Sequence, residues 1–265
     1  MKAVTPFLFA SDMDGTLFPN GQQVGEEGCV GRTRDLLQHL RKDDCPLAYI
    51  SGRYLALAQQ GLEEYDLPAP DYWVCNVGSE IYDQDGQPDP RWNDLLGPTF
   101  NHKQIQAAVA DIPLLELQEQ IKQGPHKLSF YYPEPADTGL QKRILSAIRR
   151  TTTEIKLIHS VEESTGRALI DILPKASGKS SALKYLAARH DFTSNRVFFA
   201  GDSGNDIDAL MSGVCGTLVG NAPEAVQRET REHLAATPDA RVYIADHFYG
   251  DGIIEALRYY KLISV

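Results

Sequence analysis

The chain has 265 residues, of which 42% are hydrophobic and 23% are charged, a composition typical of a globular protein. Its formal net charge is −10 and no cluster of Lys and Arg is visible, which argues against a nucleic-acid partner because phosphate backbones are bound by basic patches. No apolar run reaches the roughly 20 residues of a membrane span, and the first residues lack the basic segment and cleavage site of a secretion signal. We therefore expect a cytoplasmic protein without a membrane partner.

Short β-branched or aromatic segments alternate with longer amphipathic ones at both ends of the chain, which indicates βαβ units and a parallel sheet. In the first part we expect helices at 30–42 and 54–65, strands at 7–12, 47–51 and 72–77, and a hairpin at 80–83 with its turn at 85–86. After residue 179 we expect helices at 180–189, 206–211, 223–234 and 253–260 and strands at 196–200 and 216–219.

The pattern changes between residues 89 and 173. Here we expect helices at 103–110 and 139–150 and strands at 127–132, 154–160 and 167–173. Because strand and helix alternation stops before this region and resumes after it, the region is predicted to be an inserted domain. The predicted fold class is therefore α/β, with a Rossmann-like parallel-sheet core formed by residues 1–86 and 171–265 and an inserted α/β domain at 87–170.

The cysteines, Cys29, Cys45, Cys75 and Cys215, form no CxxC pair and have no histidine at zinc-site spacing. In a chain of this size without a secretion signal, free thiols are favoured over disulfides. We expect all four to be buried and to take no part in catalysis.

Two carboxylates, Asp12 and Asp14, follow the first expected strand, at the sheet edge where open α/β folds place their chemistry. Neighbouring positions of a continuing strand point to opposite faces, so the chain must turn here, which Gly15 permits. A shared Mg²⁺ would offset the repulsion between the two carboxylates. A surface turn rich in Asp is the alternative interpretation of this segment alone.

Three further segments carry polar residues at the ends of expected elements. Ser51, Gly52 and Arg53 follow a strand, Lys179 begins a helix, and residues 201–206 follow the strand at 196–200. Taken singly, Ser51 could be a helix N-cap, Lys179 a surface lysine and the acidic loop a capped turn. Four such segments in this order instead favour phosphoryl transfer, which needs carboxylates, a hydroxyl and a lysine at one place.

These four segments resemble the DxDGT, Ser/Thr, Lys and GDxxND motifs of the haloacid dehalogenase (HAD) superfamily of phosphatases. Only 36 residues separate Asp14 from Ser51, whereas 127 separate Ser51 from Lys179, so the insertion resembles the C2-type cap domain that some members carry between the second and third motifs. Within the superfamily, the chain is most similar to the Cof-like and sucrose-phosphate phosphatase branch, and residues 71–73, 77–82, 126–130 and 201–206 carry this similarity.

The resemblance implies roles for individual residues. Asp12 would attack phosphorus and form an aspartyl-phosphate, and Asp14 would act as general acid and then as general base. Asp12, the main-chain carbonyl of Asp14 and Asp202 would hold Mg²⁺, while Ser51 and Lys179 would bind phosphoryl oxygens. The remaining implied site residues are Ser203, Asn205 and Asp206 around the metal and Gly52, Arg53, Gly78, Ser79, Glu80, Tyr82 and Lys127 toward the substrate.

The implied function is a Mg²⁺-dependent phosphatase that hydrolyses a sugar phosphate, with sucrose 6-phosphate as the first candidate. Mannosylfructose phosphate and the mannosyl- or glucosyl-3-phosphoglycerates stay open as substrates. A phosphomutase and a non-catalytic sugar-binding protein are the alternatives from other classes. We expect a monomer whose possible protein partner is the synthase that makes the sugar phosphate.

Overall fold

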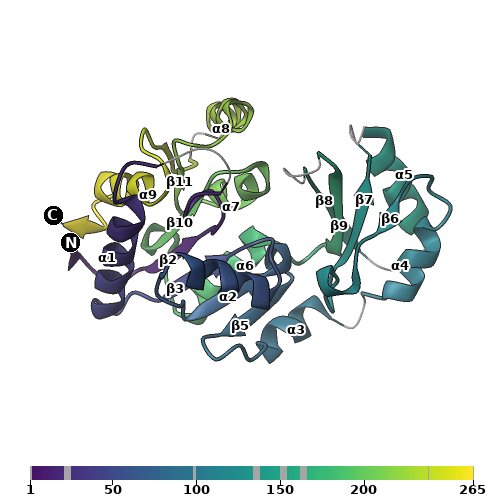
Figure 1. Cartoon of the computed structure of the whole chain (residues 1–265), viewed down its shortest axis with the longest axis horizontal. Coiled ribbons are helices and arrows are strands. Elements are labelled where there is room, and N and C mark those ends of the chain that lie inside the picture. Colours follow the sequence, from purple (N-terminus) through teal and green to yellow (C-terminus); the bar gives the residue numbers. More distant parts are fainter. Residues whose placement is uncertain are drawn as a thin grey trace.

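The computed structural model describes residues 2–20, 25–97, 100–133, 138–149, 154–161, 166–237 and 239–264. A large sheet with helices on both faces lies beside a smaller sheet that carries its own helices (Figure 1). The predicted α/β class and the predominantly parallel main sheet are confirmed. Among the described residues, none of the helices is long and apolar enough to cross a membrane.

The large sheet has seven strands in the order β12-β11-β10-β2-β3-β4-β5, and only the β4–β5 pair is antiparallel. These strands are β2 (Leu8–Ser11), β3 (Leu47–Ile50), β4 (Tyr72–Cys75), β5 (Glu80–Asp83), β10 (Val197–Gly201), β11 (Cys215–Leu218) and β12 (Val242–Ile244). Its helices are α1 (Cys29–Lys42), α2 (Leu55–Glu64), α3 (Pro90–Leu96), α6 (Lys179–Arg189), α7 (Ile207–Leu210), α8 (Glu224–Ala236) and α9 (Tyr249–Tyr259). A small antiparallel pair, β1 (Lys2–Ala3) with β13 (Ile263–Ser264), joins the two chain ends.

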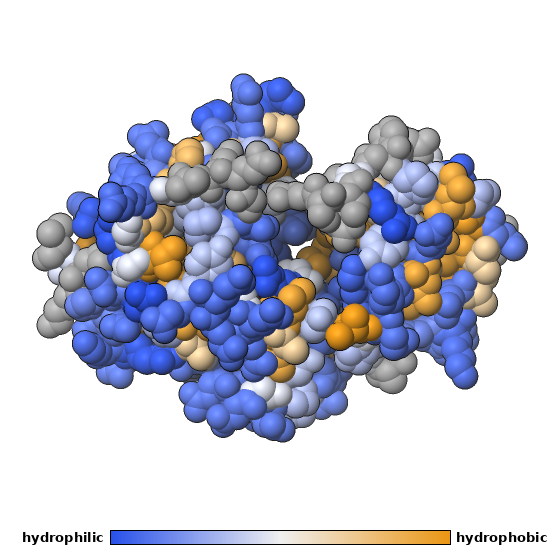
Figure 2. Space-filling view, in the orientation of Figure 1, coloured by the Kyte–Doolittle hydropathy of each residue, from blue (hydrophilic) through white to orange (hydrophobic). Residues whose placement is uncertain are grey.

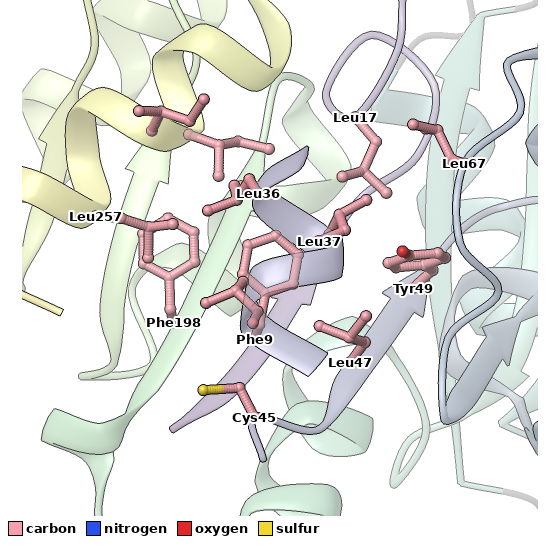
Figure 3. Packing of buried hydrophobic residues seen from close by; sticks show 14 of the residues in the cluster. Phe9, Leu17, Leu36, Leu37, Cys45, Leu47, Tyr49, Leu67, Phe198 and Leu257 are labelled. Carbon is pink, nitrogen blue, oxygen red and sulfur yellow. The ribbon is translucent and has the colours of Figure 1, made fainter. Parts of the chain in front are cut away.

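Alternate residues of each central strand point into two hydrophobic cores, one on each face of the large sheet. Phe9 packs with Phe198 and with the α1 and α9 residues Leu37 and Leu257 (Figure 3). Leu8, on the opposite face, belongs to a second core that includes residues of α3, α6 and α7. Because both faces are covered, the central strands are largely apolar, and polar side chains gather at the strand ends.

The smaller sheet has the order β6-β7-β9-β8 and is antiparallel. Its strands are β6 (Glu116–Leu117), β7 (Leu128–Tyr132), β8 (Ile155–Val161) and β9 (Ala168–Pro174), and its helices are α4 (His102–Val109) and α5 (Thr138–Ile148). One face packs on both helices, as Phe130 and Ile170 share a buried cluster with residues of α4 and α5. The predicted helix at 139–150 begins one residue earlier than expected, and residue 150 lies outside the described residues.

Two local predictions need correction, and helix α3 was not among the expected elements. The strand predicted to reach residue 77 ends at Cys75, because Asn76 and Val77 have φ values of 49° and 59° and form a 3₁₀ turn, η1 (Asn76–Gly78). Strand β5 therefore pairs with β4 through this turn, and the turn at 85–86 instead follows the hairpin. Asp89 caps α3 by accepting hydrogen bonds from the backbone of Arg91 and Trp92, and Pro90 is its first residue, a start signal that the sequence carries.

The first boundary expected for the inserted domain falls in the loop between β5 and α3, and the second falls inside a strand. Trp92 of α3, after the expected boundary at 86, packs in the second core of the large sheet with Leu183 of α6. The boundary expected after residue 170 falls within β9, which stays paired with β8 as far as Pro174. All four cysteines are buried and free, as predicted.

Candidate active site

The four polar segments meet at one edge of the large sheet. Strands β10, β2 and β3 are parallel neighbours, so the residues that follow them, Asp202, Asp12 and Ser51, emerge side by side. The backbone N–H of Asp12 donates to the carbonyl of Ala200 over 2.9 Å, which continues the β2–β10 pairing to Asp12. The surface-turn interpretation fails here, because Asp12 is only 6% exposed.

Lys179 is the buried cation at the centre of the site. Its Nζ lies 3.2 Å from Oδ1 of Asp12 and 2.7 Å from Oδ1 of Asp206, and its side chain is 1% exposed. Burial alone would lower the pKa of Lys179, but the carboxylates of Asp12 and Asp206 more than offset this and raise it. The surface-lysine interpretation is therefore wrong, and Lys179 remains charged at neutral pH.

The three carboxylates around Lys179 carry more negative charge than it can neutralise. Burial raises the pKa of Asp12 well above its usual value; Lys179 opposes this shift, and Asp206 and Asp202 add to it. Burial, with repulsion from Asp206, raises the pKa of Asp202 to about 7. A bound cation would offset this repulsion between the carboxylates.

Asp12, Asp202 and Asp206 each offer a carboxylate oxygen, and these oxygens lie within 4.8 Å of one another. Hard oxygen donors of this kind suit Mg²⁺, and three carboxylates with one ammonium leave two negative charges for a divalent ion to balance. The residues therefore fit the expected cation. The structure brings Asp206 to the cluster in addition to Asp12 and Asp202, whereas the carboxylate of Asp14 points elsewhere.

The tight turn that follows Asp12 packs against Asp202. Gly15 has a φ of 73°, and a Cβ there would lie 2.5 Å from Oδ2 of Asp202, so only glycine fits. The hydroxyl of Thr16 donates to Oδ1 of Asp202 over 2.9 Å. The sequence analysis assigns no role to Thr16. In the structure, its hydroxyl orients the carboxylate of Asp202.

Arg53 holds the carboxylate of Asp14. Its Nε donates to Oδ2 of Asp14 over 2.7 Å, Nη2 pairs with Oδ1, and Nη1 donates to the carbonyl of Leu57 over 3.0 Å. A bidentate ion pair of this kind fixes the orientation of the carboxylate as well as its distance from the guanidinium. Arg53, expected to bind substrate, thus lies beside the residue expected to act as acid and base.

Ser51 does not cap helix α2, whose N-cap is Tyr54. It is 1% exposed, and its Oγ accepts a hydrogen bond from the backbone N–H of Arg53 over 3.0 Å. The hydroxyl proton stays available to a ligand, and Gly52 between these residues leaves the backbone open to close approach. This arrangement fits the expected binding of a phosphoryl oxygen.

The loop after β10 is held by Asp206. Its Oδ2 accepts hydrogen bonds from the backbone N–H and the hydroxyl of Ser203, both over 3.0 Å, while Asn205 accepts from the same hydroxyl over 3.1 Å. A Cβ at Gly201 would lie 2.5 Å from the Cγ of Asp206, so this close packing requires glycine. One carboxylate thus fixes both its own loop and Lys179, as expected for a residue that supports the site.

The residues of η1 and β5 expected to face the substrate are largely engaged with one another. Ser79 donates to the carbonyl of Asn76 over 2.9 Å, and Glu80 accepts from Nδ2 of Asn76 over 2.9 Å and from the hydroxyl of Tyr82. Glu80 is 5% exposed, and its Oε1 packs against Gly124 in the loop before β7. Gly78 has a φ of 84° and packs on Gly178, which places this loop next to the start of α6.

The face of the smaller sheet away from α4 and α5 carries a group of buried polar side chains. Oγ of Ser129 donates to Oδ1 of Asp171 over 2.5 Å, and Nζ of Lys127 lies 3.9 Å from that oxygen. Strand β8 of the same sheet contacts the loop at 204–206, so the two sheets approach each other next to the acidic cluster. A hollow between the two lobes is visible in the space-filling view (Figure 2).

Lys156 of β8 is a residue near the site that sequence reasoning missed. Its Nζ packs against Gly178, so closely that a Cβ there would overlap it. Burial lowers the pKa of Lys156, and Asp208 opposes this shift. Its sequence context, a lysine in an alternating strand, offered no signal, because only the folded arrangement brings β8 to the start of α6.

The fold and this site together define a phosphoric monoester hydrolase of the HAD superfamily. The chain belongs to the sucrose-6F-phosphate phosphohydrolase family, whose model matches residues 5–261. The resemblance seen in the motifs is thereby confirmed.

Individual relatives agree with the family match. A protein of Nitrosococcus oceani described as a HAD-like hydrolase is 35% identical over 96% of this chain and 71% of its own length. Sucrose-phosphatase 2 of Nicotiana tabacum is 28% identical over 99% of this chain, and mannosylfructose-phosphate phosphatase of Agrobacterium fabrum is 29% identical over 96%. The chain spans 61% of the length of the tobacco protein and 97% of that of the Agrobacterium protein.

A solved structure is similar over the whole chain. The sucrose-phosphatase of Synechocystis sp. PCC6803, determined in complex with sucrose and phosphate, superposes with a TM-score of 0.82 at 28% identity. The match covers 98% of this chain and 100% of that chain. The similarity therefore extends over both sheets.

Proposed function

We propose that this protein hydrolyses sucrose 6-phosphate to sucrose and inorganic phosphate in a Mg²⁺-dependent reaction. The observation that carries the proposal is the buried Lys179 between Asp12 and Asp206, at the strand ends where Ser51 and Asp202 also emerge. Membership of the family and similarity to a sucrose-phosphatase support the choice of substrate.

In the proposed reaction a carboxylate oxygen of Asp12 forms a bond to phosphorus while the bond from phosphorus to the sugar oxygen breaks. Lys179 would favour the ionised form of Asp12 and orient it, and together with Ser51 it would bind the oxygens of the phosphoryl group. Bound Mg²⁺, held by Asp12, Asp202 and the Asp14 carbonyl with Asp206 close by, would neutralise charge on the phosphoryl group.

Asp14 would give a proton to the departing sugar oxygen and then take one from the water that attacks the aspartyl-phosphate. Arg53 would aim the carboxylate for both steps, since its two-pronged contact fixes the orientation of the group. Arg53 would accordingly serve as a positioning residue for Asp14, next to its expected role in substrate binding.

The smaller sheet would select the sugar. We propose that it forms a cap domain, between the end of α3 and Pro174, inserted into a core made by the rest of the chain. Lys127 and Asp171, which lie on the face opposite α4 and α5 and are 5% and 9% exposed, would supply the donors and acceptors that read sugar hydroxyls. Glu80 and Tyr82 would support this surface from the core side, because the loop at Gly124 covers Glu80.

Mannosylfructose phosphate is the second candidate substrate. This second substrate is supported by the similarity to the Agrobacterium mannosylfructose-phosphate phosphatase, because the chain matches 97% of that protein's length. Cytoplasmic residence, a monomeric state and a synthase partner stay predictions, and the free cysteines support the first.

The proposal is tested by phosphate release from sucrose 6-phosphate, mannosylfructose phosphate, trehalose 6-phosphate and hexose phosphates, each with Mg²⁺ and with EDTA. We expect activity only with Mg²⁺ and the highest kcat/KM on sucrose 6-phosphate. A preference for mannosylfructose phosphate would replace the substrate and keep the chemistry. Full activity in EDTA, or no phosphate release from any ester, would contradict the proposed function.

A further inference from the structure

Asn221 connects the catalytic loop to the C-terminal helix. It lies after β11, in the loop before α8, and is 9% exposed. Its Nδ2 donates to the carbonyl of Gly15 over 2.7 Å, and its Oδ1 accepts from the backbone N–H of Tyr249, the first residue of α9, over 2.9 Å. Both polar ends of one buried side chain are thus satisfied by backbone groups of distant segments.

The segment that carries Asn221 is itself tightly held. The backbone N–H of Gly220 donates to the carbonyl of His247 over 2.8 Å, and a Cβ at Gly220 would lie 2.5 Å from the carbonyl oxygen of Asp246. Val219 donates to the carbonyl of Gly201 over 3.0 Å. Asn221 therefore projects from a fixed base, and its reach to Gly15 is set by the surrounding fold.

The bond from Asn221 acts at the turn that arranges the site. Gly15 has a φ of 73° and follows Asp14. It lies against Asp202, because a Cβ at Gly15 would be only 2.5 Å from Oδ2 of Asp202. Its N–H donates to the carbonyl of Phe18 over 3.0 Å, so its peptide groups are held on both sides. A rotation of this turn would move Asp14 relative to Asp202.

We propose that Asn221 is a positioning residue that fixes the loop from Asp12 to Phe18, and with it the general acid and the Mg²⁺ ligands. The inference rests on the proposed function for its kinetic readout but concerns a residue outside the expected motifs. Without the Asn221 donor, the Gly15 carbonyl would be buried without a partner, which favours a change in the turn. Displacements of about 1 Å at reacting groups can cost about 100-fold in rate.

The decisive variant is Asn221→Asp, which keeps an oxygen for the N–H of Tyr249 but replaces the donor to Gly15 with a second oxygen. Asn221→Ala removes both bonds. Thr217→Val is the matched control, because it removes another buried hydrogen bond of the same strand and loop region, from the Thr217 hydroxyl to the carbonyl of Tyr243 over 3.0 Å. Each purified protein is assayed for kcat and KM on the best phosphate ester, for melting temperature, and for the Mg²⁺ concentration that half-saturates the Mg²⁺-induced melting shift.

We expect Asn221→Asp to lower kcat by roughly 10 to 100-fold with KM changed by less than about threefold, and to weaken Mg²⁺ binding by about tenfold or more. Asn221→Ala should match these losses and melt at a lower temperature, whereas Thr217→Val should lose melting temperature alone. Unchanged kcat and Mg²⁺ affinity in folded Asn221→Asp would overturn the inference. So would failure of both Asn221 variants to fold, since Asn221 would then serve stability. If the wild type released no phosphate, the proposed function would fall, yet the Mg²⁺ readout would still decide the role of Asn221.

Discussion

The edge of the large sheet and the polar face of the smaller sheet are built differently. At the edge, Asp12, Lys179 and Asp206 are buried in direct contact and follow strands with apolar layers on both faces. On the smaller sheet, Lys127 faces Asp171 over a longer distance of 3.9 Å, and helices cover only the opposite face. The first arrangement holds its charged groups in direct contact at the sheet edge, while Lys127 and Asp171, which are also buried, lie further apart and belong to a separate sheet. Reaction and selection should therefore be separable by mutation.

Replacement of Asp12 should have the largest effect and should affect all substrates equally. Asp12→Asn lacks the nucleophile, so phosphate release should fall at least ~10⁴-fold on both sucrose 6-phosphate and p-nitrophenyl phosphate. Steady-state assays, with mass spectrometry to exclude deamidation, measure this. Asp35→Asn, on the exposed side of α1, is the charge-matched control and should remain active. Near-normal turnover of Asp12→Asn would show that the reaction does not use this carboxylate.

Loss of the contact between Arg53 and Asp14 should have the next largest effect. The loss should be similar for sugar phosphates of different sizes. Arg53→Ala frees the carboxylate of Asp14, and kcat should drop roughly 10 to 100-fold on sugar phosphates. Arg53→Lys keeps the charge but not the two-pronged geometry and should recover only part of the loss. Because p-nitrophenolate needs little protonation, its release should suffer less. A full recovery by lysine would mean that charge alone matters at this position.

Lys127 tests the selecting surface. Lys127→Ala should lower kcat/KM for sucrose 6-phosphate by roughly 10 to 100-fold, as expected for a polar contact worth about 1.5 to 3 kcal/mol, and leave p-nitrophenyl phosphate nearly unchanged. Lys175→Ala, an exposed lysine paired with Glu154 just after β9, is the control. Equal losses on both substrates would assign Lys127 to the fold or to the phosphate site and would remove the distinction between the two regions.

The smallest expected effect concerns stability without metal. Because the pKa of Asp202 is raised to about 7, the native state binds more protons than the unfolded state between about pH 4 and pH 7. The free energy of unfolding should therefore fall as pH rises through this window, and melting in EDTA should drop by at least ~2 °C from pH 5 to pH 8. Mg²⁺ at pH 8 should reverse the drop. Asp202→Asn should flatten this pH dependence, and an unchanged slope in that variant would place its cause elsewhere.

Much of the catalytic edge could be predicted because three of the four motifs lie directly after a strand that the local pattern reveals, and the fourth begins a helix. Asp12, Ser51 and Asp202 needed only the rule that parallel strands end at a common edge. The alternation of strands and helices predicted the α/β class, and its interruption predicted the inserted region. The apolar pattern was misleading at residues 76–77, where left-handed φ values end the strand at Cys75. The pattern also missed α3, which packs on the large sheet.

The sequence by itself determined the class of chemistry, because carboxylates, a hydroxyl and a lysine at strand and helix ends leave few alternatives. Only the tertiary structure decided how these groups are paired. Arg53 holds Asp14, Thr16 donates to Asp202 across 186 positions of sequence, and Asn221 reaches Gly15 across 206. Such contacts depend on the order of strands in the sheet and on loops that pack together from distant segments. Local spacing carries no record of them, since their partners become neighbours only when the chain has folded.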